Sequence, residues 1–401
     1  MTTLDDLRHV IRRIESRHGV RQAAEPIETV VGGTLVETDQ GRVVVVRHDY
    51  PLEHRHGRQR LGDAFDLSDE IVHGLARAGE QPDDPRRLLF IDVETTGLAG
   101  GTGTYAFLVG VGALEADRFV VTQYFMRDFD DEPALLALLA PRLAGAAGVV
   151  TFNGSGFDLP LLETRFILGR HRWPTRLPHL DLMTPARRVW VRCFPDCRLA
   201  TVEREALGLV REQDVAGALI PTLYFQFLRT RRARPLTRVF AHNRDDVLSV
   251  AALLGWLGRA LAADVPSWVT PLELVGIGRI WEQLDPERSG VCYRAALDAG
   301  LAGWPWLWTC LRLAAWEKRR ERWSDACELW HAAARSTIFD PRPWEELAKF
   351  HEHRDRDVAA ARRIVSSAID LARSAGAASL IVDRFAYRLD RLDRRLARGR
   401  R

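Results

Sequence analysis

Two carboxylic acids, Asp92 and Glu94, stand two residues apart directly after the apolar run 88–91. Such an unbroken run, followed by Gly97, predicts a central strand buried on both faces. Side chains two residues apart on a strand point to the same face, so both carboxylates are directed together. Buried together they repel each other and lose hydration unless a cation lies between them. The pair therefore indicates a site for a hard divalent ion; the alternative is a strand end where both acids reach solvent.

Two more acids follow at places where strands are expected to end. Asp158 comes after the short apolar strand 148–152 and directly before an expected helix, 159–168. It could line a site or could simply be the N-cap of that helix. Asp181 lies on or near the end of a further expected strand, 177–183, and could support the same site.

The last acid is expected on a long amphipathic helix, 238–261. His242 and Asp246 are four residues apart on it and therefore share one face. Asp245 is a competing candidate, but on a helix it would point roughly 100° away from Asp246. We favour Asp246, with an exposed His242 on the helix surface as the alternative for the imidazole.

The order of expected elements indicates the fold class. Three strands, a helix, a strand, a helix, a strand and final helices form a mixed α/β layout around one five-stranded sheet. The second and third strands, 105–114 and 119–126, are joined tightly enough to pair antiparallel. The expected helices cover residues 133–143, 159–168, 201–207, 219–228 and 238–261.

Length and composition bound the number of domains and the class of protein. With 401 residues, 46% of them hydrophobic, the chain can form two or more domains with sizeable cores. Residues 1–87 are expected to be an N-terminal appendage with an early helix, a hairpin at 34–46 and a linker at 81–87. No apolar run approaches ~20 residues, so we expect no membrane span and a cytoplasmic location. A net charge of +3 excludes a polycation, and five scattered cysteines exclude a disulfide framework.

The segment 270–401 is expected to be an all-helical domain with an Arg-rich end. A small-x3-large-x2-small pattern occurs three times in it, starting at residues 289, 326 and 361. The spacing between successive occurrences is close to the ~34-residue period of tetratricopeptide repeats. Its members are Ser289/Tyr293/Ala296, Ala326/Trp330/Ala333 and Ala361/Val365/Ala368. The pattern resembles such repeats imperfectly and predicts a docking surface for protein or nucleic acid.

Three ordered motifs resemble those of the DEDD exonuclease superfamily, whose fold is ribonuclease H-like. They are Asp92-x-Glu94-Thr-Thr-Gly, Asn153-x3-Phe157-Asp158 and His242-x3-Asp246. The finer resemblance is to the YprB-type ribonuclease H-like family and covers roughly residues 88–262, the expected nuclease domain. It implies that two divalent ions, Mg²⁺ or Mn²⁺, are held by four acids, Asp92, Glu94, Asp158 and Asp246. It also implies contacts with the terminal nucleotide from Thr95, Thr96, Gly97, Leu98, Asn153 and Phe157.

The third motif departs from the superfamily pattern. There it is usually Tyr-x3-Asp or His-x4-Asp, whereas this chain has His242 at the tyrosine spacing. One turn from Asp246, the imidazole could orient or deprotonate the attacking water.

The resemblance implies a metal-dependent phosphodiesterase. The motifs favour a 3′–5′ exonuclease on single-stranded nucleic acid, but the fold also hosts endonucleases, and DNA and RNA are both open as substrates. The alternative is a scaffold whose nuclease fold is catalytically idle and which binds nucleic acid or protein through its helical repeats. A zinc hydrolase is disfavoured because the chain offers no His-rich ligand set.

Overall fold

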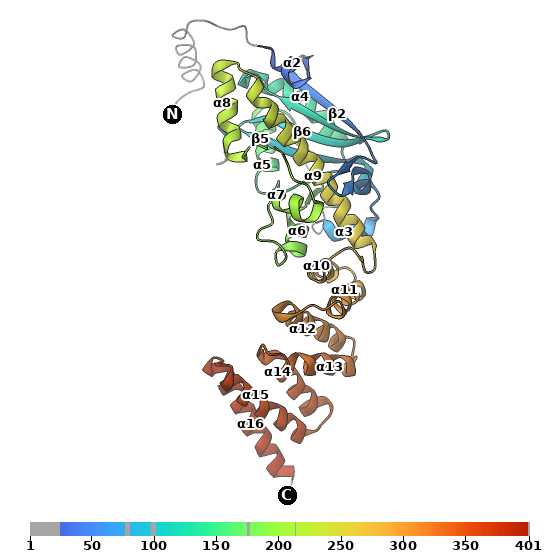
Figure 1. Cartoon of the computed structure of the whole chain (residues 1–401), viewed down its shortest axis with the longest axis vertical. Helices are drawn as coiled ribbons and strands as arrows, with labels where there is room; N and C mark the ends of the chain where they lie inside the picture. The colour runs from blue at the N-terminus through green and yellow to red at the C-terminus, as the bar shows by residue number, and fades with distance from the viewer. Residues whose placement is uncertain (1–24, 77–80, 98–101, 175–176, 213, 400–401) are drawn as a thin grey trace. The chain divides into compact units, whose positions relative to one another are not determined.

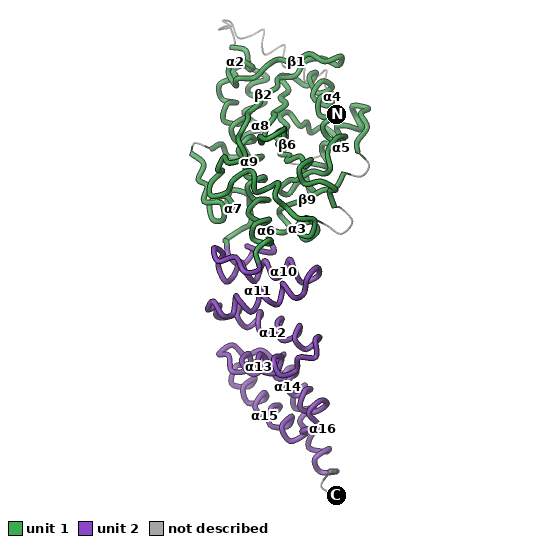
Figure 2. Tube along the Cα trace, turned by 90° about the vertical axis from the view of Figure 1, so that its right-hand side faces the viewer, with its two compact units in different colours: residues 1–187, 194–263 green, residues 188–193, 264–401 purple. Residues whose placement is uncertain are grey.

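The computed structural model describes residues 25–76, 81–97, 102–174, 177–212 and 214–399. The chain divides into two compact units, residues 1–187 with 194–263 and residues 188–193 with 264–401 (Figure 2). The helix expected in the first twenty residues lies outside the described ranges. Among the described helices, none has the length and apolar character that crossing a membrane requires.

The first unit contains a seven-stranded sheet in the order β1-β2-β7-β6-β5-β8-β9. Its strands are β1 (Thr34–Thr38), β2 (Gly41–Pro51), β5 (Leu88–Thr95), β6 (Ala106–Glu115), β7 (Arg118–Phe125), β8 (Gly148–Thr151) and β9 (His179–Asp181). The pairs β5/β8 and β8/β9 are parallel, and the other neighbours are antiparallel. The mixed α/β class is confirmed, and the five expected strands are the contiguous group from β7 to β9.

The expectation of only five strands in the sheet was wrong because the segment before β5 adds two more. The hairpin β1/β2 is longer than its sequence pattern indicated, and β2 pairs with β7 from Val44↔Phe125 to Pro51↔Arg118. Val43, Val44 and Val46 are buried, so the hairpin shares the hydrophobic core of the first unit.

Helices, short helical turns and one small hairpin surround this sheet. The α-helices are α2 (Ile27–Val31), α3 (Asp69–Leu75), α4 (Glu132–Gly145), α5 (Asp158–Leu168), α6 (Met183–Trp190), α7 (Leu199–Val202), α8 (Ile220–Thr230) and α9 (Thr237–Ala262). The hairpin is β3 (Arg55–His56) with β4 (Gln59–Arg60), and α7 continues into a π-helical turn, Glu203–Leu207. Helix α9 contacts β5, β6 and β7 and lies across the sheet in Figure 1.

Two glycines in β6 let α9 approach the sheet closely. A Cβ at Gly110 would overlap the Asn243 side chain, and one at Gly112 would lie 2.7 Å from Val247 Cγ1. Positions 110 and 112 share one strand face, and 243 and 247 are one helical turn apart. The two contacts therefore fix both the position and the rotation of α9 above β6.

The rest of the described chain is all-helical, as expected. Its helices are α10 (Pro271–Trp281), α11 (Pro286–Asp298), α12 (Gly303–Arg319), α13 (Trp323–Ala334), α14 (Pro341–Lys349), α15 (Val358–Ser374) and α16 (Ser379–Gly399). Each contacts the next along the chain (Figure 1). Trp281, Trp316 and Trp330 are buried, so these indoles form part of the helical core. The assignment of tetratricopeptide-like repeats stays a prediction.

We expect Gly112→Ala to lower the free energy of unfolding of the first unit by about 1–3 kcal/mol, because the added Cβ would overlap Phe119 Cζ, would lie 2.7 Å from Val247 Cγ1 and would overpack the space between β6 and α9. The measurement is urea unfolding followed by circular dichroism. The matched control is Gly145→Ala at the end of α4, where an added Cβ meets nothing within 4 Å. Equal stability of the two variants would contradict the close-approach argument.

Candidate functional site

One buried amide connects three strands to helix α9. Asp92, Gly110 and Gln123 lie side by side in register across β5, β6 and β7. Asn243 lies over this row: its Nδ2 donates to Asp92 Oδ2 at 2.8 Å, and its Oδ1 accepts from Gln123 Nε2 at 2.8 Å. Sequence analysis missed Asn243, although it stands three residues before Asp246 and so shares that helix face. The amide fixes the orientation of the Asp92 carboxylate.

The four acids of the three motifs affect one another electrostatically. Burial, with the charges of Asp246, Glu94 and Asp158, raises the pKa of Asp92 well above its usual range. Burial, reinforced by Asp246 and Asp158, raises the pKa of Glu94 to about 8 despite the opposing effect of His242. Burial, with Asp246 among its neighbours, also raises the pKa of Asp158 to about 7. The fold therefore brings all four carboxyl groups into one electrostatic cluster.

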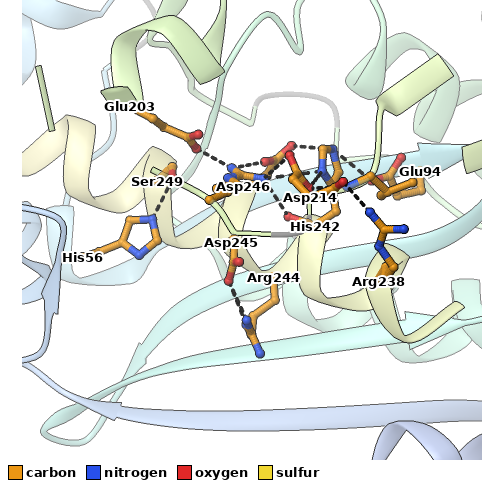
Figure 3. Close-up of polar contacts among 12 residues, drawn as sticks. His56, Glu94, Glu203, Asp214, Arg238, His242, Arg244, Asp245, Asp246 and Ser249 are labelled. Atoms are coloured by element: carbon orange, nitrogen blue, oxygen red, sulfur yellow. Dashed lines mark hydrogen bonds and ion pairs between the residues drawn. The ribbon is translucent and has the colours of Figure 1, made fainter. Parts of the chain in front are cut away.

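Asp246, and not Asp245, faces this cluster. Asp246 Oδ2 lies 3.6 Å from His242 Nε2 and its Oδ1 pairs with Arg211 (Figure 3). Asp245 instead forms an ion pair with its neighbour Arg244, with 2.8 Å between Oδ1 and Nη2. The geometry agrees with our preference for Asp246.

His242 is held in one orientation by a carboxylate behind it. Its Nδ1 lies 2.7 Å from Asp214 Oδ1, while Nε2 faces Glu94 Oε1 at 3.9 Å. Burial raises the pKa of Asp214, but its hydrogen bond to His242, the charges of His242 and Arg211 and the N–H of Val215 together outweigh this, and the net pKa is lowered. An ionised Asp214 only accepts hydrogen bonds, so Nδ1 of His242 is the donor and Nε2 is directed at the acids. The His242 side chain is only 16% exposed, unlike a residue on a solvated helix surface.

The pKa of His242 is set by two opposing effects. Burial lowers it, but Asp246 and Glu94 raise it, and the net pKa lies above the usual value.

Arg211 places a cation among the acids. Its Nη2 pairs with both Glu203 and Asp246, and its Nη1 lies 3.9 Å from Asp214 Oδ2. The side chain is only 11% exposed, and its Nε has no hydrogen-bond partner among the described residues. Sequence analysis missed Arg211 because it stands 35 residues before Asp246 in a segment without periodicity. Arg211 neutralises Asp246 in this structure.

Asp181 anchors the turn that leads to Asp158. Its carboxylate accepts from the backbone N–H groups of Asn153 (2.7 Å), Ser155 (3.1 Å) and Met183 (3.1 Å) and from the Ser155 hydroxyl (2.5 Å). Burial raises the pKa of Asp181, but these hydrogen bonds outweigh it and lower the net value. Asn153 has a left-handed backbone, with φ 69°. The expected support from Asp181 therefore takes the form of a turn that positions the start of α5.

Asp158 is the first residue of α5, and the N-cap is Phe157 without a side-chain cap. The N-cap alternative for Asp158 is therefore not realised. Its carboxylate makes no hydrogen bond within the described part of the chain, and Asp181 and Asp246 both raise its pKa.

The remaining predicted residues lie in the segment after Glu94. Thr95 is buried, and its hydroxyl donates to the carbonyl oxygen of Gly97 at 2.9 Å. Thr96 exchanges hydrogen bonds with Tyr105, whose N–H donates to the Thr96 hydroxyl at 3.0 Å. Leu98 lies outside the described residues. These contacts shape the turn that follows β5.

The four carboxyl groups are suitable ligands for a hard divalent ion, but in this structure their side chains are not close enough together to hold one. Four carboxyl groups that raise one another's pKa values would be stabilised by a cation between them. Within the described ranges, however, no three His, Cys, Asp or Glu side chains are grouped closely enough to hold a metal ion. Arg211 pairs with Oδ1 of Asp246, while Oδ2 lies 3.6 Å from His242 Nε2. A metal ion held by Asp246 would therefore compete with the positive charge of Arg211.

Comparison with known proteins agrees with this fold. Residues 89–258 match the model of a family described as the RNase_H superfamily, so a ribonuclease H-like domain, a nuclease-type fold, precedes the all-helical region. The chain is similar to the uncharacterized protein YprB of Bacillus subtilis (strain 168), at 29% identity over 337 residues. That similarity covers 80% of this chain and 79% of YprB.

In chelator, the acid cluster should make the folded protein less stable as the pH rises. Folded Glu94 and Asp158 hold their protons up to about pH 8 and 7, whereas unfolded carboxyl groups release theirs near pH 4. At these two positions the unfolded chain therefore binds fewer protons between about pH 4.5 and 8, and their contribution to the free energy of unfolding falls by up to about 1.4 kcal/mol per pH unit for each proton.

Glu94→Gln should remove part of this fall, and we would measure the difference from wild type by urea unfolding at pH 5, 6, 7 and 8. Asp245→Asn, outside the cluster, should keep the wild-type dependence. If the difference between Glu94→Gln and wild type is constant over this range, Glu94 does not hold its proton as argued.

Proposed function

We propose that the ribonuclease H-like domain is a divalent-metal-dependent nuclease, a 3′–5′ exonuclease acting on single-stranded DNA or RNA. The observation that carries the proposal is the grouping of four partly buried carboxyl groups, Asp92, Glu94, Asp158 and Asp246, whose charges raise the pKa values of Asp92, Glu94 and Asp158. Burying acids together costs free energy that ordinary folding gives no reason to accept. The order of the motifs and the match to a nuclease-type fold support the same function.

The four acids would hold two divalent ions. When bound, these ions would activate a water molecule and stabilise charge on the scissile phosphate and the leaving oxygen. Asn243 keeps the Asp92 carboxylate in a fixed orientation. His242, held through Nδ1 by Asp214, would accept a proton at Nε2, which faces the acids.

The terminal nucleotide would contact the turn after β5 and the turn before α5. By resemblance, its partners would be Thr95, Thr96, Gly97, Leu98, Asn153 and Phe157. The hydrogen bonds of Asp181 and Thr96 would keep these two turns in place before the nucleotide arrives.

We expect Asp92→Asn to reduce cleavage of end-labelled single-stranded RNA and DNA in Mn²⁺ or Mg²⁺ by at least about 10³-fold, because it removes a charge that would hold the ions. The labelled end gives the polarity, and chelator should abolish cleavage by wild type.

The matched control is Asp245→Asn, because Asp245 is an acid of the same helix that pairs with Arg244. It should retain cleavage within a few-fold of wild type. Cleavage that survives Asp92→Asn would exclude this site as its source.

A second candidate function is a catalytically idle scaffold, and Arg211 is the observation that favours it. A permanent pair of Asp246 with Arg211 would satisfy the acid without any metal ion. The two candidates differ in whether Asp246 can leave Arg211.

If Asp246 exchanges partners, Arg211→Gln should strengthen Mn²⁺ binding about tenfold, because about 1.4 kcal/mol of competing attraction is removed. The measurement is titration calorimetry of the full chain. Since Arg211→Gln leaves buried Glu203 unpaired, the double variant with Glu203→Gln is measured beside it.

Arg244→Gln is the control, because Arg244 pairs with Asp245 outside the cluster. No binding of Mn²⁺ by wild type or by either Arg211 variant would favour the scaffold.

A further inference from the structure

Three arginines of the helical unit gather around one indole. The guanidinium carbons of Arg192, Arg279 and Arg312 lie 4.6, 6.0 and 4.9 Å from the ring centroid of Trp308. Arg192 follows α6, Arg279 belongs to α10, and Arg312 and Trp308 belong to α12. We call these four residues the Trp308 cluster.

The positive charge of the Trp308 cluster is only partly compensated. Arg312 pairs with Glu282, but Arg192 and Arg279 have no carboxylate within ion-pair distance among the described residues. Arg279 donates to the carbonyl oxygen of Arg188 at 3.3 Å. Burial, followed by the charges of Arg279 and Arg312, lowers the pKa of Arg192. Arg192 and Arg279 thus stand beside a third arginine without carboxylates of their own in the described part of the chain.

The indole orients these cations without using their hydrogen-bond donors. A guanidinium stacked on an aromatic face is attracted by the ring while its N–H groups remain directed outward. Arg192 and Arg312 are exposed, and Trp308 is half-buried. Planar donor sets of this kind match the oxygens of a phosphate group.

A cavity adjoins the Trp308 cluster. Trp308 and Arg312 line a space of about 450 Å³, with Arg319 and Arg342 among its other lining residues. Its acids include Glu282 and Glu346, and these are already paired with Arg312 and Lys318. Ligand pockets in proteins typically measure about 300–1,000 Å³, so the cavity has room for a nucleotide unit beside the arginines.

We propose that the Trp308 cluster binds phosphate groups of a single-stranded nucleic acid. The proposal rests on the proposed nuclease function and adds to it a second contact with the substrate strand, on the helical unit. Nucleic acid is favoured over an acidic protein segment because the cations are stacked arginines, which suit closely spaced phosphates, and because a nucleotide-sized cavity adjoins them.

The test is fluorescence anisotropy of 5′-labelled 20-nucleotide RNA and DNA with the full chain in chelator, at several salt concentrations. Arg192→Gln/Arg279→Gln should weaken binding about tenfold and reduce the salt slope by about 1.4, because single strands lose about 0.7 per phosphate contact. Trp308→Leu, which keeps all three charges but not their orientation, should weaken binding with a smaller change in slope.

The matched control removes two arginines from another part of the same unit. Arg363→Gln/Arg373→Gln changes two exposed arginines of α15 and should leave the dissociation constant within about twofold of wild type. Thermal unfolding of every variant establishes that the helical unit remains folded.

The outcomes separate this inference from the nuclease proposal. If wild type cleaves the strand in Mn²⁺ while Arg192→Gln/Arg279→Gln binds it with unchanged affinity and slope, the inference fails and the nuclease stands. If the strand binds through these arginines but is never cleaved, the nuclease fails and the inference stands. No binding by wild type, or displacement of the strand by a polyglutamate peptide at equal charge, would overturn nucleic acid as the ligand.

Discussion

The electrostatic cost of grouping four partly buried carboxyl groups is the constraint on which the first unit depends. Asp92 and Glu94 belong to the interior strand β5, so neither backbone position can move without disturbing the sheet. The surrounding residues reduce the cost in different ways. Asn243 donates a hydrogen bond to Asp92, and Arg211 brings a positive charge to Asp246. The pKa values of the remaining acids rise, so in the absence of another cation part of the negative charge is removed by bound protons.

This compensation depends on backbone geometry as much as on charge. Asn243 reaches the row of Asp92 and Gln123 only because Gly110, which lies between them in the sheet, has no side chain. A larger residue at position 110 would push the Asn243 amide out of this row and so break its hydrogen bonds to Asp92 and Gln123. The close approach of α9 to β6 thus determines both how the core packs and how far Asp246 on α9 lies from the acids on β5.

The sequence was sufficient for the strand core, for the pairing of acids on β5 and for placing His242 and Asp246 on one face of α9, because each follows from a local period of two or of 3.6 residues. It was insufficient for Arg211, whose contacts are set by long-range packing and leave no local pattern. The extension of the sheet by β2 was also missed, because pairing with β7 depends on surface that appears only after the core strands assemble.

The arrangement of Arg211 would allow Asp246 to exchange this partner for a metal ion. Arg211 contacts Glu203 as well as Asp246, and Glu203 belongs to none of the three acid motifs. If Asp246 turned toward a metal ion, Arg211 would keep a buried carboxylate partner, so no unpaired cation would be left inside the protein. A buried pair broken without such a second partner costs about 3–5 kcal/mol. Glu203 therefore lowers the free-energy difference between a state in which Asp246 pairs with Arg211 and one in which it is free to bind a cation.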